Sequence, residues 1–197
     1  MSKQIPSNFD AHIKKFYVKE INGSQTEKII RDLKPDIMLQ CGAGILKENI
    51  FSIPKRGTLN VHHGIAPELR GVSSVFWAMY YGLYDYIGTT VHFIDKTLDT
   101  GAVIIQSKTN LPKQFDYIEA AYQTSIQGAT LLVEAIKIVR EDFVVTKKNV
   151  KSYYFSSVSY QKYWKLKKNK FQPLENQNTL SYKIKCKKLL LPTAHLQ

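Results

Sequence analysis

Short apolar runs and helical patterns succeed one another along the first half of the chain. Residues Lys15–Ile21 alternate apolar and polar positions, which predicts a strand. Asn22 and Gly23 predict a turn, and the capping box of Ser24 and Glu27 opens a helix that Pro35 ends. The apolar run Asp36–Cys41 then predicts a buried parallel strand. This order predicts a β-α-β unit with a right-handed crossover in a layered sheet.

The same alternation of patterns continues to about residue 140. A β-like run begins at Thr58, and further strands are expected over Gly88–Ile94 and Ala102–Ser107. Ser73 or Ser74 can cap a helix to about Tyr81, whose aromatic side chains we expect in the core. Asp116 and Glu119 open a long helix that reaches about Arg140 and should pack across the sheet. The sequence therefore predicts an α/β fold with three layers and a Rossmann-like, mostly parallel sheet.

Charge divides the chain into two parts. The net charge is +12, and residues 142–197 hold twelve lysines and no arginine against Asp142 and Glu175. We expect a catalytic domain over 1–142 and a short, basic, aromatic C-terminal extension over 143–197. Within this extension we expect little order after Gln172, apart from a strand-like run at Leu180–Ile184. The lysines form either a solvated surface or a site for an anionic partner.

Composition excludes several classes of protein. No stretch has the apolar length of a membrane span, and Met1–Lys15 lacks the apolar core of a signal peptide, so we expect a cytoplasmic protein without a membrane partner. Cys41 and Cys186 have no metal-ligand spacing and indicate reduced thiols. His63 should point away from His62 on an extended chain, which disfavours a metal site.

The stretch TLNVHHGIAPELRG, residues 58–71, carries the first candidate chemistry. Asn60 and His62 lie two apart, so on a strand both side chains leave the same face. They come at the carboxyl end of that strand, where open α/β sheets bind ligands. Asn60 can donate to a developing oxyanion, and His62 can polarise a carbonyl or move a proton near neutral pH. A second motif follows downstream, LDTG at residues 98–101.

Together these motifs resemble the folate-dependent formyltransferase family. The family pattern is N-x-H, a Pro-containing loop that ends in Arg/Lys-Gly, a strand of T-V-H-F type, and D-x-G. This chain supplies Asn60, His62, Pro67, Arg70, Gly71, the strand Thr89–Ile94 and Asp99–Gly101. The resemblance extends from about Lys34 to Gln106, with one local departure, Gly64-Ile65-Ala66-Pro67 in place of Ser-Leu-Leu-Pro.

The resemblance implies transfer of a formyl group from 10-formyltetrahydrofolate to a primary amine. Asn60, His62 and Asp99 would be catalytic. Asn60 would stabilise the oxyanion, and Asp99 would keep His62 charged and accept the proton of the amine. The residues expected to bind the donor are Gly44, Ile45, Leu46, Phe51, His92, Asp95, Lys96, Thr97, Leu98 and Gly101. Purely structural roles remain as alternatives: a strand-to-helix turn at Gly42–Gly44, a packing role for His92, and a turn role for Asp99.

The resemblance also bounds the acceptor. Family members usually carry a further strand, glycine-bearing loop and helix ahead of Lys15, which suggests an amino-terminally shortened formyltransferase fold. We expect a small-molecule amine, by elimination a nucleotide-linked amino-sugar, with nucleic acid disfavoured and a homodimer left open. The segment Ser152–Lys170 could form a hairpin and helix that seal the acceptor side. The alternatives are formylation of phosphoribosylglycinamide or another amine, hydrolysis of the formyl folate, or a truncated non-catalytic protein that binds folate or RNA.

Overall fold

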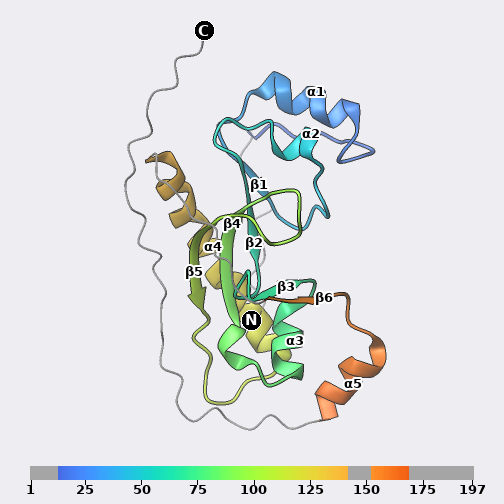
Figure 1. Ribbon diagram of the computed structural model, residues 1–197, viewed down its shortest axis with the longest axis vertical. Coiled ribbons are helices and arrows are strands. Elements are labelled where there is room, and N and C mark those ends of the chain that lie inside the picture. Colours follow the sequence, from blue (N-terminus) through green and yellow to red (C-terminus); the bar gives the residue numbers. More distant parts are fainter. Residues whose placement is uncertain (1–12, 142–151, 169–197) are drawn as a thin grey trace.

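A four-stranded sheet forms the centre of the protein, seen in the computed structural model, which describes residues 13–141 and 152–168 (Figure 1). The strands are β1 (Met38–Gln40), β2 (Thr58–His62), β4 (Gly88–Phe93) and β5 (Val103–Lys108), in the order β1-β2-β4-β5. β1 pairs with β2 in parallel, whereas the β2–β4 and β4–β5 pairs are antiparallel. The α/β class is confirmed, but the sheet is mixed rather than mostly parallel, because β4 and β5 form a meander after β2.

The long helix α4 (Tyr117–Arg140) covers one face of this sheet. Asp116 caps it by accepting a hydrogen bond from the Glu119 amide, as the capping box predicted. A core cluster lies between helix and sheet: Leu59, Val91, Ile104, Ala135 and Val139. Gly128 lets the two layers approach, since a Cβ there would lie 2.9 Å from Val61 Cγ1.

The short helical elements form two groups: α1 (Ser24–Leu33) contacts α2 (Glu48–Phe51), and α3 (Ser74–Tyr80) contacts both the 3₁₀ turn η1 (Tyr84–Tyr86) and α4. Thr58, on the face opposite α4, donates to the Phe51 carbonyl of α2 at 2.7 Å. The aromatic side chains of α3 lie in a second core, as expected, with Phe76 and Trp77 buried. None of the helices among the described residues is long and apolar enough to span a bilayer.

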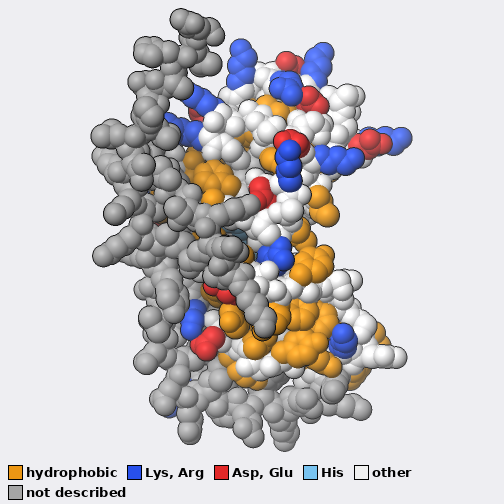
Figure 2. All heavy atoms as spheres, in the orientation of Figure 1, with side chains coloured by type: hydrophobic (Ala, Val, Ile, Leu, Met, Phe, Trp, Pro, Cys, Tyr) orange, Lys and Arg blue, Asp and Glu red, His pale blue; other side chains and the backbone are white. Residues whose placement is uncertain are grey.

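A second, two-stranded sheet joins β3 (Leu69–Gly71) to β6 (Tyr153–Phe155), and α5 (Tyr160–Lys168) follows. The helix in Ser152–Lys170 is thus confirmed, but the expected hairpin is wrong, because β6 pairs in parallel with the distant β3. Phe155 stacks on Trp77 and on Tyr81 of the α3 C-terminus, which fixes β6 to the body of the protein. Apolar side chains gather over this region in Figure 2, whereas charged side chains gather over α1.

Two local predictions near the amino terminus are also wrong. Lys15–Ile21 is not a strand: its side chains are largely exposed, and it pairs with no strand among the described residues. The predicted β-α-β unit therefore lacks its first strand here and consists of α1 followed by β1. Helix α1 is confirmed, but Gly23 is its N-cap and no side chain caps it. Glu27 instead binds Arg31 and Asn49. The predictions for residues 172–197 lie outside the described residues.

Candidate active site

Strands β2 and β4 bring the polar side chains of the two motifs together. In their antiparallel register Asn60 lies beside His92, and His62 lies beside Thr90. Leu59 and Val61 pack toward α4, so alternation places Asn60 and His62 on the opposite face of the sheet. Asn60 Nδ2 lies 3.2 Å from His92 Nε2 across the strand pair.

Asp99 reaches this face from the loop between β4 and β5. Its backbone has the left-handed φ of +52°, which turns the chain back toward the sheet. Its Oδ2 lies 3.4 Å from His62 Nδ1, and its Oδ1 lies 3.6 Å from His92 Nε2. The Gly71 amide of β3 donates to Oδ2 at 2.9 Å. The three predicted side chains Asn60, His62 and Asp99 therefore form one cluster at the carboxyl end of β2.

The second nitrogen of each imidazole is held by the backbone. His62 Nε2 lies 2.8 Å from the Leu69 carbonyl oxygen, and His92 Nδ1 lies 2.8 Å from the Phe93 carbonyl oxygen. A carbonyl can only accept, so both of these nitrogens must carry the proton and donate. The nitrogen left on each ring, His62 Nδ1 and His92 Nε2, faces Asp99. In the neutral rings these nitrogens are acceptors, so Asp99 has a proton-accepting nitrogen on either side.

Burial sets the charge state of this cluster. Burial lowers the pKa of His62 below its usual value, and the neighbouring Asp99 carboxylate only partly offsets this effect. Burial opposes ionisation of Asp99, but the neighbouring imidazoles of His92 and His62 and the Gly71 amide together hold the pKa of Asp99 below its usual value. Burial and the Asp99 carboxylate thus act in opposite directions on the pKa of His62, and the role expected of Asp99, to keep His62 charged, stays a prediction.

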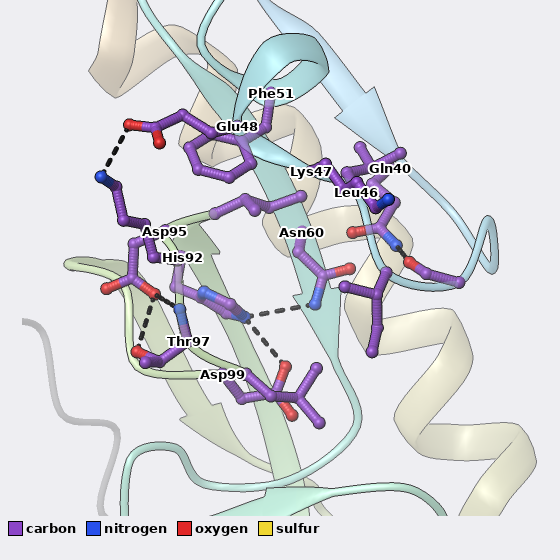
Figure 3. Close-up of a pocket in the computed structure, with 15 residues that line it drawn as sticks. Gln40, Leu46, Lys47, Glu48, Phe51, Asn60, His92, Asp95, Thr97 and Asp99 are labelled. Atoms are coloured by element: carbon purple, nitrogen blue, oxygen red, sulfur yellow. Dashed lines mark hydrogen bonds and ion pairs between the residues drawn. The ribbon is translucent and has the colours of Figure 1, made fainter. Parts of the chain in front are cut away.

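A cavity of about 380 Å³ opens next to this cluster, between the β1–α2 segment and the β4–β5 loop (Figure 3). Every residue that we expected to bind the donor lines it except Gly101. A Cβ on Gly101 would lie 1.6 Å from the Phe93 carbonyl oxygen, so Gly101 lies against β4 and holds the loop in place. His92 lines the cavity while it is buried and hydrogen-bonded through both ring nitrogens, so its role in donor binding stays a prediction.

Four lining residues of this cavity were missed by sequence reasoning: Gln40, Lys47, Glu48 and Ile94. Gln40 donates to the Gly44 carbonyl and so shapes the glycine turn, while Glu48 and Lys96 form an ion pair of 3.0 Å across the cavity mouth. Ile94 shares a strand face with His92 in the alternation pattern, which is the one signal that could have identified it.

A second cavity of about 580 Å³ adjoins the first. Six residues line both cavities and form their shared wall, with Asn60 and Asp99 among them; the others are Gln40, Gly44, Ile45 and Leu98. His62 and His63 both line the second cavity, although their side chains point apart as the alternation rule predicted: His63 faces Gly128 of α4 beside Val61, whereas His62 faces Asp99. Among the described residues no group of three His, Cys, Asp or Glu side chains is placed to hold a metal ion.

The loop after His62 is fixed by buried polar contacts. Thr90 Oγ1 donates to the Gly64 carbonyl at 2.7 Å and accepts from the Ala66 amide at 3.0 Å. Gln106 Nε2 donates to the Ala66 carbonyl at 2.6 Å. These bonds tie the loop to β4 and β5, so the end of β2 is held in position.

The amino-acid sequence of this chain is similar to those of known proteins. The sequence profile described as formyl transferase matches residues 1–144. Methionyl-tRNA formyltransferase from Thermodesulfovibrio yellowstonii is 30% identical over 121 residues, which are 61% of this chain and 39% of the relative. The corresponding protein from Desulforamulus reducens is 32% identical over 121 residues, 60% of this chain and 38% of the relative. The chain thus spans about two fifths of the length of these curated relatives.

Solved structures share the fold at low sequence identity. A 4-N formyltransferase from Francisella tularensis superposes with a TM-score of 0.58 and 21% identity, covering 67% of this chain and 53% of that protein. The formyltransferase PseJ from Anoxybacillus kamchatkensis, solved in complex with UDP-4,6-dideoxy-4-formamido-L-AltNAc and tetrahydrofolate, gives a TM-score of 0.58 and 21% identity, covering 70% and 74%. At this identity the likeness concerns the fold.

Proposed function

Because the chain belongs to the formyl transferase family, we propose that it transfers a formyl group from 10-formyltetrahydrofolate to the primary amine of a small acceptor. The observation that carries the proposal is the wall shared by the two cavities, lined on both sides by Asn60 and Asp99. One cavity would hold the donor and the other the amine, so the reacting groups would meet at these two side chains.

The first cavity fits a flat heterocyclic donor. Its volume lies in the usual range for small-molecule pockets, and its walls combine apolar side chains with turn backbone. Leu46, Phe51 and Ile94 would contact the ring system, while residues 95–98 would contact its polar edge. When bound, the donor supplies the formyl group that the amine attacks. The tetrahydrofolate named in the PseJ complex supports this assignment.

Asn60 would stabilise the negative charge that develops on the formyl oxygen. Its Nδ2 donates toward His92 Nε2, and the second N–H of the same amide is available to a ligand in either cavity. β2 and β4 fix this amide before any substrate binds, so little reorganisation is needed. Removal of one such donor lowers the rate by about 10²–10³ in comparable sites.

Asp99 would accept the proton that the attacking amine loses. It is a carboxylate with acceptor nitrogens on both sides, so the proton can be shared with His62 Nδ1 or His92 Nε2 instead of being lost to water. The same proton can then return to the departing folate nitrogen. His62 would act through Asp99 in this scheme, because the Leu69 carbonyl occupies its Nε2–H.

For the acceptor we propose a nucleotide-linked amino-sugar. Tyr117 of α4 and Tyr154 of β6 line the second cavity, and aromatic faces of this kind pack well against sugar rings. The formamido-sugar nucleotide named in the PseJ complex supports this choice. A second candidate is methionyl-tRNA, which the names of the curated relatives suggest.

Two measurements test the proposal. Isothermal titration with a non-hydrolysable analogue of 10-formyltetrahydrofolate should show binding. Formyl transfer should then be measured against a panel of nucleotide-linked amino-sugars and methionyl-tRNA. A formylated sugar supports the proposed acceptor, formylated methionyl-tRNA replaces it, and formate release without an amine indicates hydrolysis. Failure of the analogue to bind would refute the function.

A further inference from the structure

The outer side of α4 carries a line of exposed apolar side chains. Ile118, Tyr122, Ile126 and Val133 are 63%, 59%, 48% and 53% exposed. Their spacing places them on one face of the helix, opposite the residues that pack on the sheet. In Figure 1 this helix lies behind the sheet, and the face opposite the sheet is distinct from Tyr117 and Ala121, the α4 residues that line the second cavity. Four large apolar side chains in one line form a patch of the kind that marks an interface.

We propose that this face binds the same face of a second copy of the chain, with the two α4 helices antiparallel. The line is self-complementary about a point between Gln127 and Gly128. In that register Tyr122 lies opposite the partner's Val133, Ile126 opposite the partner's Ala129, and Ile118 opposite the partner's Lys137. In the first two pairs a large side chain meets a smaller one, as close helix packing requires, and the apolar stem of Lys137 can cover Ile118.

The charges at the two ends of α4 fit the same arrangement. The amino-terminal end carries Asp116 and Glu119, and the carboxyl-terminal end carries Lys137 and Arg140 together with Glu134, which pairs with Lys137 at 3.0 Å, and Glu141. In the antiparallel register Glu119 lies within one residue, about 1.5 Å of axial rise, of the partner's Lys137. Asp116 likewise approaches the partner's Arg140. A parallel pair would place Glu119 beside the partner's Glu119 and Lys137 beside the partner's Lys137, so these two positions favour the antiparallel pair.

Polar groups beside the line are already satisfied within the helix. Ser125 Oγ donates to the Ala121 carbonyl at 2.8 Å, and Thr130 Oγ1 donates to the Ile126 carbonyl at 3.3 Å. Both can therefore enter an interface without leaving an unpaired hydroxyl donor.

Self-complementarity of shape and of charge distinguishes a second copy from other occupants. A two-fold interface uses the same patch on both subunits, and a patch that pairs with itself in both respects meets this condition. A helix of 24 residues is about 36 Å long, enough for an extended helix–helix contact. An anionic membrane would favour basic side chains along the helix, whereas here the acidic ones (Asp116, Glu119, Glu134, Glu141) outnumber Lys137 and Arg140.

The test is the mass of the full-length chain in solution. Sedimentation velocity over a range of concentrations should show twice the chain mass of 22.6 kDa for the wild type. Ile126→Glu should give a monomer. Leu33→Glu, at a 50% exposed position on α1, is the matched control and should leave the dimer intact. Circular dichroism should show unchanged helix content in both variants, because both sites are exposed.

A charge swap tests the register. Glu119→Lys and Lys137→Glu should each weaken the dimer by about tenfold, and more at low salt, because two attractive contacts become repulsive. The double variant should restore the wild-type affinity. A wild type that stays monomeric up to its solubility limit overturns the proposal. So does a dimer that survives Ile126→Glu, and a double variant as weak as the single ones contradicts the antiparallel register.

Discussion

Gly101 holds the loop that carries Asp99, and its replacement gives a sharp test of the site geometry. A Cβ at this position would lie 1.6 Å from the Phe93 carbonyl oxygen and 3.3 Å from His92 Nδ1. Side-chain Cβ contacts under 3.0 Å essentially never occur, so Gly101→Ala must move the loop or β4 by about 1.4 Å, the difference between 3.0 and 1.6. The same carbonyl accepts the His92 Nδ1–H bond, so His92 would move with it.

Two magnitudes follow from this displacement. Overpacking of this kind lowers the free energy of unfolding by about 1–3 kcal/mol. A shift of about 1 Å at a reacting group lowers the rate by about 10²-fold, because Asp99 would leave its place 3.4 Å from His62 Nδ1. Urea unfolding measures the first quantity and the rate of formyl transfer measures the second.

Gly23→Ala is the matched control for this variant. Gly23 is the remote N-cap of α1, and a Cβ there would be 3.2 Å from Glu20 Cβ, which a small adjustment can relieve. It should leave the transfer rate unchanged. A Gly101→Ala protein with wild-type stability and rate would refute the reasoning that close contact with β4 positions Asp99.

Three further outcomes are expected from the same geometry. Asp99→Asn keeps the shape of the side chain and an oxygen for the Gly71 amide but loses the proton acceptor. The rate of formyl transfer should therefore fall by about 10²–10³-fold, while the affinity for the analogue, measured by titration, stays within about twofold. Phe51→Ala removes a wall of the first cavity and should weaken analogue binding by about tenfold or more. Burial lowers the folded-state pKa of His62 and His63 below the unfolded value of about 6.5. The folded state then binds fewer protons than the unfolded state. The contribution of these two histidines to the free energy of unfolding should therefore be fully present above about pH 6.5 and decrease as the pH drops below it. Urea unfolding from pH 5 to 8 should show a shallower slope for His62→Gln than for the wild type, and an unchanged slope would contradict the burial argument.

The sequence predicted the parts of the site that depend on local periodicity. Asn60 and His62 share a strand face because their spacing is two, and α4 begins at the Asp116 cap because the capping box is a local signal. The loop from Asp95 to Asp99 was assigned to the site by family resemblance, and it lines the first cavity.

The missed features depend on partners that are distant in the sequence. Alternation in Lys15–Ile21 predicted a strand, but a strand needs a neighbour, and pairing is not encoded in the period alone. The pairing of β6 with β3 joins residues more than 80 positions apart, so the nearer hairpin was the natural prediction. The burial that lowers the pKa of His62 is likewise a property of the folded protein, so no local pattern could predict it.

One measurement tests the central claim most directly. A formyl group labelled on the donor should be followed to the amine under single-turnover conditions, with wild-type protein and with Asp99→Asn. We predict labelled formamide with the wild type, little of it with the variant, and equal analogue binding by both. Transfer at the wild-type rate by Asp99→Asn, or no transfer to any amine by a wild-type protein that binds the analogue, would contradict the proposal that Asn60 and Asp99 join a donor cavity to an acceptor cavity.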